Sequence, residues 1–456
     1  MSDRELDLSR YDVLVIGGGP AGMGAALSAQ AAGARVAIIE RDAHLGGILR
    51  QCIHPGFGLE HFKEELTGPE YAQRLIDQVK RTDIDVLTDT MVLSIDADES
   101  DGEGAPARSP RALHTVSCMS PKGYVELTAP SVVLAMGCRE RTRSEIKIPG
   151  SRPAGVFTAG LAQRYINIEN LAPGKRFVIL GSGDIGLIMA RRLALEGFEV
   201  EGVYELMPYA NGLFRNVKNC LEDFNIPLHL STTVTRIIGH DRLEAVEVSR
   251  VDENLSPIPG TERVVPCDAL LLSVGLIPEN EISVAAGVEL DPRTRGAVVT
   301  QDLMTSVPGI FSCGNVLHVH DLADNATAEA ERAGAAAASW AKLAVEDEGD
   351  ARSLHAHGEP LHVEAGGIAG YALPELISNT DKLVKVFFRV RRPHDRACIR
   401  VTSGDEVLFE GKPRAFKPSI MESMPLTPKM MRQAHGSITF SVEPVADADE
   451  SAKEVG

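Results

Sequence analysis

The sequence predicts an α/β protein that contains two copies of one strand–turn–helix–strand unit, followed by a smaller C-terminal region. Two observations lead to this fold class. Short apolar runs rich in β-branched residues, typical of buried parallel strands, lead directly into glycine-rich turns at residues 17–22 and 181–186. Each turn is followed by an apolar helical stretch and by a second strand that ends in a glutamate, and 164 residues separate the two copies.

The first unit extends from Tyr11 to Glu40. Gly17 allows a tight turn, Gly19 lets a pyrophosphate approach the backbone, and Gly22 lets the helix pack against the strand. Glu40 follows Gly22 by 18 residues, which is the spacing of a carboxylate that accepts ribose hydroxyls. Strand, helix, second strand and acid together predict a Rossmann-like dinucleotide-binding domain rather than a glycine-rich turn without a ligand.

The second unit extends from Arg176 to Glu205 and repeats this pattern, with Glu205 placed 19 residues after Gly186. A carboxylate at the end of this strand accepts ribose hydroxyls and repels a 2′-phosphate. The second unit is therefore expected to favour NAD(H) over NADP(H). Arg215 and Lys218 follow closely, and either could fold back and reverse this preference.

Composition excludes several classes of function. The 46 basic and 64 acidic residues give a formal charge of −18 and a pI near 5.2, which argues against a nucleic-acid partner. The charged N-terminus does not resemble a signal peptide, and no apolar run approaches the roughly 20 residues of a transmembrane helix. The seven cysteines are scattered and form no CxxC pair, so a cytoplasmic protein with reduced thiols is expected.

Three further segments carry a resemblance to a known family. They are SVVLAMG at 131–137, DALLLSVGLIPEN at 268–280 and GIFSCGN at 309–315. With the two glycine-rich units, they resemble the two-dinucleotide-binding-domain flavoproteins of the pyridine nucleotide-disulfide oxidoreductase superfamily. The resemblance implies that the first unit binds FAD and the second binds NAD(P). Asn315 stands where that family has an acid that contacts the ribityl chain of FAD.

The glycine motifs and the resemblance together name two sets of cofactor-binding residues. For FAD they are Gly17, Gly19, Pro20, Ala21, Gly22, Glu40, Arg41, Gly47, Ala135, Gly137, Gly314 and Asn315. For NAD(P) they are Gly181, Gly183, Asp184, Ile185, Gly186, Glu205 and Gly275.

The same anchors predict the domain organisation. The FAD-binding domain is discontinuous, at residues 8–152 and 281–345, and the NAD(P)-binding domain occupies 153–280. Residues 148–157 are expected to cross between them, and residues 96–111 to form a solvated hairpin loop. An Ala-rich helix is expected at 325–345, with its start toward the flavin. Residues 346–456 are expected to form a small α+β or β-rich domain that contacts a partner.

A redox dithiol is absent from the position at which disulfide reductases of the superfamily carry one. After Gly47 the chain reads ILRQCIHPGFG, with the single cysteine Cys52. Cys52 and His54 are weak catalytic candidates, and the alternative is that Cys52 is a small buried residue beside the flavin. Arg139, Arg141 and Arg143 are interpreted as a solvated face rather than a phosphate clamp.

Two pairs of histidines have spacings that are found in metal sites, HVHDLAD at 318–324 and HAHGEP at 355–360. Neither pair has a clear third or fourth ligand in the sequence. They are interpreted as surface or linker histidines, and no metal site is predicted.

A narrower resemblance concerns residues 45–72 and the C-terminal segment FFRVRRP…KPRAFKPSIMESMPL. Both are similar to the flavoprotein subunits that accompany bacterial FAD-dependent glycerol-3-phosphate dehydrogenases. The resemblance implies an FAD-dependent NAD(P)H:acceptor oxidoreductase in which hydride passes between nicotinamide C4 and flavin N5. It also implies that the partners are an FAD-dependent dehydrogenase and a small cysteine-rich protein. Relatives in opine, hydroxyproline and cyanide-forming oxidases leave the electron donor open.

Other functions remain open at the level of the sequence. They are a stand-alone NADH oxidase or peroxidase that uses Cys52, a component of an opine or amino-acid oxidase, and a non-catalytic FAD-bound scaffold or redox sensor. The segment KVFFRVRRP mixes apolar, aromatic and Arg residues as interfaces do, so the C-terminal domain is expected to dock the dehydrogenase. A cover for the flavin domain or a homo-oligomer face is the alternative.

Overall fold

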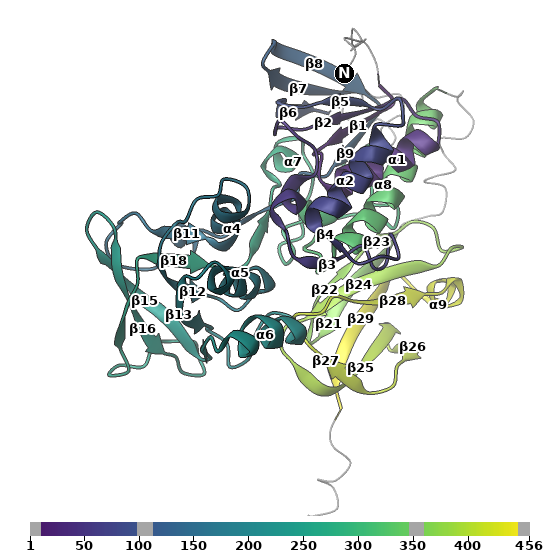
Figure 1. Cartoon of the computed structure of the whole chain (residues 1–456). Coiled ribbons are helices and arrows are strands. Elements are labelled where there is room, and N and C mark those ends of the chain that lie inside the picture. Colours follow the sequence, from purple (N-terminus) through teal and green to yellow (C-terminus); the bar gives the residue numbers. More distant parts are fainter. Residues whose placement is uncertain (1–10, 98–112, 346–359, 446–456) are drawn as a thin grey trace, which may run out of the picture. The chain divides into compact units, whose positions relative to one another are not determined.

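The computed structural model describes residues 11–97, 113–345 and 360–445 (Figure 1). Its contacts divide the chain into two compact units. The first contains residues up to 50, residues 54–138 and the chain from 278 onward, and the second contains 51–53 and 139–277. The second unit thus begins at Arg139, whereas the sequence placed the crossing at 148–157. The three-domain division stays a prediction.

The first unit contains a parallel five-stranded sheet in the order β20-β9-β1-β2-β5. Its strands are β1 (Val13–Ile16), β2 (Val36–Ile39), β5 (Asp85–Leu87), β9 (Ser131–Leu134) and β20 (Ile310–Ser312). Every residue of β1, β2, β9 and β20 is buried. This is the reason that these segments read as continuous apolar runs rather than as alternating ones.

Two helices pack closely beside this sheet, α1 (Pro20–Ala31) and α8 (Ala323–Val345) (Figure 1). A Cβ on Gly24 would lie 3.0 Å from Thr327, and a Cβ on Gly334 would lie 2.0 Å from the Ala25 carbonyl oxygen. Glycine at these positions therefore sets the distance between the helices. The long helix α8 carries the residues of the predicted Ala-rich pattern.

Two further elements complete the N-terminal part of the first unit. Helix α2 (Gly68–Val79) begins with a capping box formed by Thr67 and Glu70. An antiparallel sheet contains β6 (Met91–Asp96), β7 (His114–Ser120) and β8 (Gly123–Ala129). Most of the predicted hairpin loop at 96–111 lies outside the described residues.

The second unit repeats this architecture. Its parallel sheet has the order β11-β18-β12-β13-β14 and is accompanied by an antiparallel three-stranded sheet, β15-β16-β17. The parallel strands are β11 (Val156–Thr158), β12 (Arg176–Leu180), β13 (Glu199–Tyr204), β14 (Leu228–His229) and β18 (Ala269–Leu272). The others are β15 (Thr232–Gly239), β16 (Leu243–Arg250) and β17 (Arg263–Pro266). Helices α4 (Ala159–Asn167), α5 (Asp184–Leu195) and α6 (Phe214–Cys220) belong to the same unit. The predicted fold class, with two Rossmann-like domains, is confirmed.

The C-terminal part of the first unit is mainly β-structure with its own hydrophobic cluster, to which Phe388, Phe416 and Phe440 contribute. One sheet contains β21 (Leu361–Gly367), β23 (Leu376–Ile377), β25 (His394–Ser403), β26 (Glu406–Glu410), β27 (Arg414–Phe416) and β29 (Ser437–Pro444). The other contains β22 (Ala369–Leu373), β24 (Val384–Val390) and β28 (Glu422–Leu426), and one helix, α9 (Pro428–Gln433), precedes β29.

The segment KVFFRVRRP is partly buried and partly at the surface, where Lys385, Arg391, Arg392 and Pro393 are exposed. Most of it is the central strand β24, in which Val386 and Phe388 are fully buried in the C-terminal core. Arg389 forms an ion pair with Asp321 and donates a 3.0 Å hydrogen bond to the Val319 carbonyl oxygen. Packing within the chain thus accounts for Val386, Phe388 and Arg389, and docking of a partner by the C-terminal domain stays a prediction.

Glu375, which precedes β23, makes the stability of the protein dependent on pH. Its side chain is 7% exposed, and burial raises its pKa from 4.5 to about 7. The folded state therefore holds this proton more tightly than the unfolded state does. The resulting stabilisation is complete below pH 4.5 and is lost as the pH rises through 7.

We expect Glu375→Gln to raise the free energy of unfolding by about 1–3 kcal/mol at pH 8, where the wild type must bury a carboxylate. At pH 4.5 the two proteins should be equally stable. Urea denaturation at both pH values measures the difference, with Glu406→Gln on exposed β26 as the control. Equal stability of wild type and Glu375→Gln at pH 8 would contradict the assignment.

Candidate functional site

The glycines of the first glycine-rich turn differ in their surroundings. Gly17 and Gly22 are packed tightly against backbone atoms, and Gly19 is not. A Cβ on Gly17 would lie 2.4 Å from the Ala135 carbonyl oxygen, and a Cβ on Gly22 would lie 1.8 Å from the Gly17 carbonyl oxygen. A Cβ on Gly19 would meet no protein atom within 4 Å. Gly17 and Gly22 are thus required by the fold, whereas Gly19 borders open space.

The other predicted FAD residues gather around this turn. Pro20 and Ala21 form the first turn of α1, whose N-terminus has no side-chain cap and no acidic residue. A Cβ on Gly47 would lie 3.0 Å from the Gly19 Cα, and a Cβ on Gly314 would lie 2.7 Å from the Ala21 Cβ. Gly137 follows β9, and its carbonyl oxygen accepts from the Glu279 backbone N–H. The uncapped N–H groups and the open space at Gly19 fit a pyrophosphate.

Glu40, which is predicted to bind a ribose, also holds the glycine-rich turn in place. One carboxylate oxygen accepts from the Gly18 N–H at 2.7 Å, and the other accepts from the Asp42 N–H at 2.7 Å. Its side chain is 8% exposed, and the neighbouring Arg41 is exposed. A carboxylate has about four lone-pair positions, so two remain for ribose hydroxyls.

Glu205 repeats this arrangement in the second unit. Its Oε2 accepts from the Ser182 N–H at 2.9 Å and from the Ser182 hydroxyl at 2.6 Å, and its Oε1 accepts from the Met207 N–H at 2.9 Å. Three of its lone pairs are thus engaged, and one remains for a ribose hydroxyl. The sequence spacing did not indicate that both glutamates stabilise the turns that precede them.

The second glycine-rich turn is built around Ser273, which follows β18. A Cβ on Gly181 would lie 2.1 Å from the Ser273 carbonyl oxygen, and the Ser273 hydroxyl accepts from the Gly186 N–H at 3.0 Å. Gly183 precedes α5, which begins at Asp184 and Ile185 and has no side-chain cap at its N-terminus. One Asp184 carboxylate oxygen accepts from the Leu213 N–H at 2.9 Å, so the side chain anchors the chain before α6.

Arg141 was interpreted from the sequence as part of a solvated face, but the structure makes it a candidate nucleotide-binding residue. Its backbone N–H donates to the Gly275 carbonyl oxygen at 3.0 Å, and a Cβ on Gly275 would lie 3.8 Å from its side chain. The Arg141 Nε is buried and has no hydrogen-bond partner among the described residues. An unpartnered buried donor beside Gly275 fits an anionic cofactor group.

The other two arginines of this cluster differ from Arg141. Arg143 donates to the backbone carbonyl oxygens of Ile148, Gly150 and Ser151, at 2.6–3.3 Å. Its guanidinium is therefore used to shape a loop of the second unit. Arg139 is exposed.

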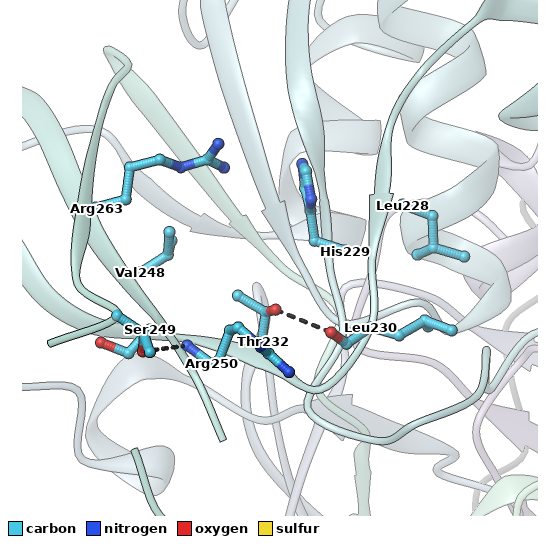
Figure 2. A pocket seen from close by; sticks show the side chains of 9 residues that line it. Leu228, His229, Leu230, Thr232, Val248, Ser249, Arg250 and Arg263 are labelled. Carbon is cyan, nitrogen blue, oxygen red and sulfur yellow. Dashed lines mark hydrogen bonds between the residues drawn. The ribbon is translucent and has the colours of Figure 1, made fainter. Parts of the chain in front are cut away.

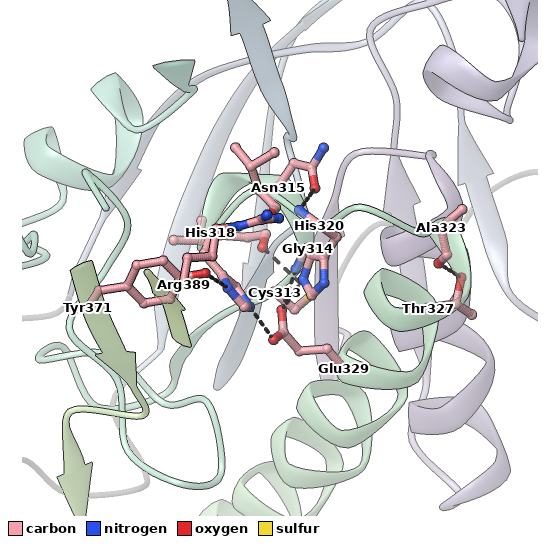
Figure 3. A network of polar contacts seen from close by, with 12 residues as sticks. Cys313, Gly314, Asn315, His318, His320, Ala323, Thr327, Glu329, Tyr371 and Arg389 are labelled. Atoms are coloured by element: carbon pink, nitrogen blue, oxygen red, sulfur yellow. Dashed lines mark hydrogen bonds and ion pairs between the residues drawn. The ribbon is translucent and has the colours of Figure 1, made fainter. Parts of the chain in front are cut away.

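Gly314 and Asn315 belong to a buried polar network (Figure 3). The Gly314 N–H donates to Glu329 Oε1 at 2.8 Å, and the Asn315 Oδ1 accepts from the His320 backbone N–H at 3.0 Å. The Asn315 amide nitrogen lies 3.7 Å from Cys138 Sγ. Glu329 comes from α8, so this helix positions the turn that carries Asn315.

The interpretation of His318 and His320 as surface histidines is wrong. Their side chains are 1% and 2% exposed, and both imidazoles contact Glu329. Burial raises the pKa of Glu329, but the two imidazoles outweigh burial and hold it well below its usual range. The sequence could not indicate this contact, because Glu329 is one of several charged residues along α8. His355 and His357 lie outside the described residues.

The half-buried Cys52 lies in surroundings that disfavour a thiolate. Burial raises its pKa from 9.0 to about 12, and its Sγ lies 3.8 Å from Gln163 Oε1. The thiol is therefore protonated at neutral pH and is a poor nucleophile. His54 is exposed, and its ring packs against Phe57 with the ring centroids 5.0 Å apart.

The second unit contains a cavity of about 440 Å³ between β14 and the antiparallel strands (Figure 2). His229, Arg250 and Arg263 contribute to its lining. The His229 ring stacks on Tyr204 with centroids 4.6 Å apart, and Arg263 donates to the Tyr204 hydroxyl at 3.1 Å. None of the predicted nucleotide-binding residues lines this cavity.

In the described residues no helix is both long enough and apolar enough to cross a membrane.

The sequence model of the pyridine nucleotide-disulphide oxidoreductase family matches residues 11–330. An opine oxidase subunit of Agrobacterium tumefaciens (strain Ach5) is 28% identical over 320 residues, which cover 67% of this chain and 61% of that protein. An alkyl hydroperoxide reductase subunit of Pseudomonas putida is 27% identical over 312 residues, covering 68% of this chain and 54% of that protein. The match thus spans little more than half the length of these relatives.

Solved structures show the same fold. Thioredoxin reductase of T. acidophilum matches with a TM-score of 0.57 and 23% identity, over 72% of this chain and 98% of that chain. Thioredoxin reductase of Lactococcus lactis matches with a TM-score of 0.57 and 21% identity, over 74% of this chain and 100% of that chain.

Proposed function

The chain belongs to the pyridine nucleotide-disulphide oxidoreductase family, a family of FAD-dependent NAD(P)H oxidoreductases, and we propose that it is the electron-transfer subunit of a substrate dehydrogenase. The observation that carries this proposal is the pair of glycine-rich turns without a dithiol. All seven cysteines lie in the described residues, and no two of them form a disulfide there. A disulfide-reducing route needs two exchanging thiols. The opine oxidase relative from Agrobacterium tumefaciens is itself named as one component of a larger enzyme.

The chain's own residues would bind and orient the cofactors. The first turn of α1 and Gly19 would bind the FAD pyrophosphate, and Glu40 the adenosine ribose. The start of α5, Glu205 and Arg141 would bind the nicotinamide dinucleotide in the second unit. When bound, FAD supplies hydride exchange with the nicotinamide. No side chain of the chain is assigned as a general base.

For the partner we favour an FAD-dependent dehydrogenase of the glycerol-3-phosphate type, together with a small cysteine-rich protein. This rests on the resemblance of residues 45–72 and of the C-terminal segment. Membership of an opine oxidase is the second candidate, and the similarity to the opine oxidase relative favours it. A stand-alone oxidase or peroxidase that uses Cys52 is disfavoured, because burial keeps its thiol protonated.

Anaerobic stopped-flow mixing with NADH tests the proposal first, since a functional flavoprotein should lose its yellow colour within a turnover. The reduced protein should then consume oxygen slowly alone and pass electrons rapidly to a co-expressed dehydrogenase. Supplying glycerol 3-phosphate or an opine to the complex, with NAD⁺ as acceptor, distinguishes the two partners. A protein that stays yellow with NADH and NADPH, or that consumes oxygen at full rate without a partner, contradicts the proposal.

We expect NADH to be preferred over NADPH by at least about tenfold in kcat/KM, because the Glu205 carboxylate accepts a ribose hydroxyl and repels a 2′-phosphate. Glu205→Gln should reduce the ratio of the two kcat/KM values. The amide oxygen can still accept a hydrogen bond from Ser182, but the side chain no longer carries the negative charge that repels a 2′-phosphate. Arg192→Gln on α5 is a control at a charged position outside the motif. NADPH preferred by the wild type, and equally by Glu205→Gln, would contradict the expectation.

A further inference from the structure

Two histidines and one glutamate form a compact buried group that the proposed function does not use. His318 and His320 lie between the Gly314–Val316 turn and α8, and Glu329 lies on α8 (Figure 3). His318 Nε2 is 2.8 Å from Glu329 Oε2, and His320 Nε2 is 3.1 Å from Glu329 Oε1. The donor atoms all lie within 4.8 Å of one another, and the imidazole centroids are 4.3 Å apart.

We propose that His318, His320 and Glu329 bind a divalent transition-metal ion, with Zn²⁺ as the best fit. Two imidazole nitrogens and the carboxylate oxygens form a donor set that this ion prefers. Bonds of about 2.1 Å at angles of about 90–110° place neighbouring ligand atoms about 3.0–3.4 Å apart. The observed separations of 2.8 and 3.1 Å lie close to this range. The whole donor set spans up to 4.8 Å, which exceeds this range, so the two imidazoles would have to move closer together around the ion.

Charge favours a cation in this group. The Glu329 side chain is 2% exposed, and another acid, Asp321 on the same loop as the two histidines, is already paired with Arg389. The carboxylate thus faces two imidazoles and the Gly314 N–H, and no lysine or arginine is paired with it among the described ion pairs. A divalent cation would offset the buried carboxylate without a charged imidazole.

The residues around the group are arranged to orient its ligands. His318 Nδ1 lies 3.3 Å from the Tyr371 hydroxyl, on the side of the ring opposite the carboxylate. The Gly314 N–H fixes Glu329 Oε1, and Asn315 fixes the His320 backbone. Hydrogen bonds of this kind commonly fix the rings and carboxylates that bind metals.

The burial of the ligands assigns a structural role to the ion. All three side chains are at most 2% exposed, and closed sites supply folding energy rather than an open position for substrate. The ion would tie the 318–320 loop to α8 and so fix the turn that carries Gly314 and Asn315. The proposal is independent of the proposed function, because binding is measured without turnover.

The rival interpretation is a hydrogen-bonded group in which the imidazoles donate to Glu329 and no ion binds. Elemental analysis of the full-length protein distinguishes the two. The protein should carry a tag without histidine, and it should pass through chelator-treated buffer before measurement. We expect about one zinc per chain in the wild type and in His362→Ala, an exposed histidine on β21. His320→Ala should contain almost none.

Zinc titration keeps the proposal testable if His320→Ala does not fold. Chelator-treated wild type should bind one Zn²⁺ and unfold at a higher temperature with it. The more conservative His318→Gln should weaken binding at least about 100-fold and lose the thermal shift. Wild type that takes up no stoichiometric Zn²⁺, or equal zinc content in His320→Ala and His362→Ala, overturns the proposal and leaves the electron-transfer function untouched.

Discussion

Gly19→Val is expected to yield a folded but colourless protein. The two added methyl groups and the Cβ would occupy the open space in front of Gly19, where the pyrophosphate of FAD would approach the backbone. We expect FAD affinity to fall at least about 100-fold, which corresponds to roughly 2.7 kcal/mol. The ratio of flavin absorbance to protein absorbance after gel filtration, followed by FAD titration, measures the loss.

The geometry also supplies the controls for this experiment. Because a Cβ at Gly19 meets no protein atom within 4 Å, the Gly19→Val apoprotein should unfold at the same urea concentration as wild-type apoprotein. Gly19→Ala should show a smaller loss of FAD. A Gly17→Val variant should instead fail to fold, since its Cβ would lie 2.4 Å from the Ala135 carbonyl oxygen. A yellow, fully loaded Gly19→Val protein would show that FAD does not bind at this turn.

Arg389→Met is expected to destabilise the first unit by about 2–4 kcal/mol. Arg389 and Asp321 are 19% and 18% exposed, so their ion pair lies between a fully buried and a surface pair. Removing the guanidinium leaves Asp321 mostly buried, with the Met421 N–H at 2.7 Å as its remaining partner among the described hydrogen bonds. Urea denaturation followed by the fluorescence of Trp340, the single tryptophan, measures the change.

Two further variants distinguish the stability lost with the ion pair from the stability that any substitution in this segment would cost. The double variant Asp321→Asn/Arg389→Met should recover part of the lost stability, because it leaves no unpaired buried charge. Arg392→Met, at an exposed position on the same segment, should change stability by less than about 0.5 kcal/mol. A double variant that is no more stable than Arg389→Met would contradict the charge argument.

The parts of the fold that the sequence predicted are those governed by local physics. Each glycine-rich unit places strand, turn, helix and second strand within about 30 residues, so periodicity and turn chemistry define it before any distant contact forms. Both units and their order appear in the structure. The β-rich character of residues 360–445 was also visible, since strands such as β24 carry an alternating pattern.

The features that the sequence did not predict depend on contacts between different elements of the fold. His318 and His320 contact Glu329, which is only 11 and 9 residues away but lies on another element, α8, and no spacing rule connects the three. Arg141 becomes a candidate only because the fold brings it beside Gly275, 134 positions away in the chain. The composition of KVFFRVRRP could not show which of its residues are buried, since a core strand and an interface share apolar and Arg residues.

Glu40 and Glu205 each have two roles, and for Glu205 this limits how the preference for NADH over NADPH can be changed by engineering or by evolution. Each acid stands where a ribose is predicted to bind and at the same time accepts from the N–H of the second residue of its glycine-rich turn. A change from NADH to NADPH by replacing Glu205 with a small or basic residue would also release the Ser182 backbone and hydroxyl. A successful exchange therefore needs a compensating substitution at Ser182, so the two positions should change together rather than one at a time.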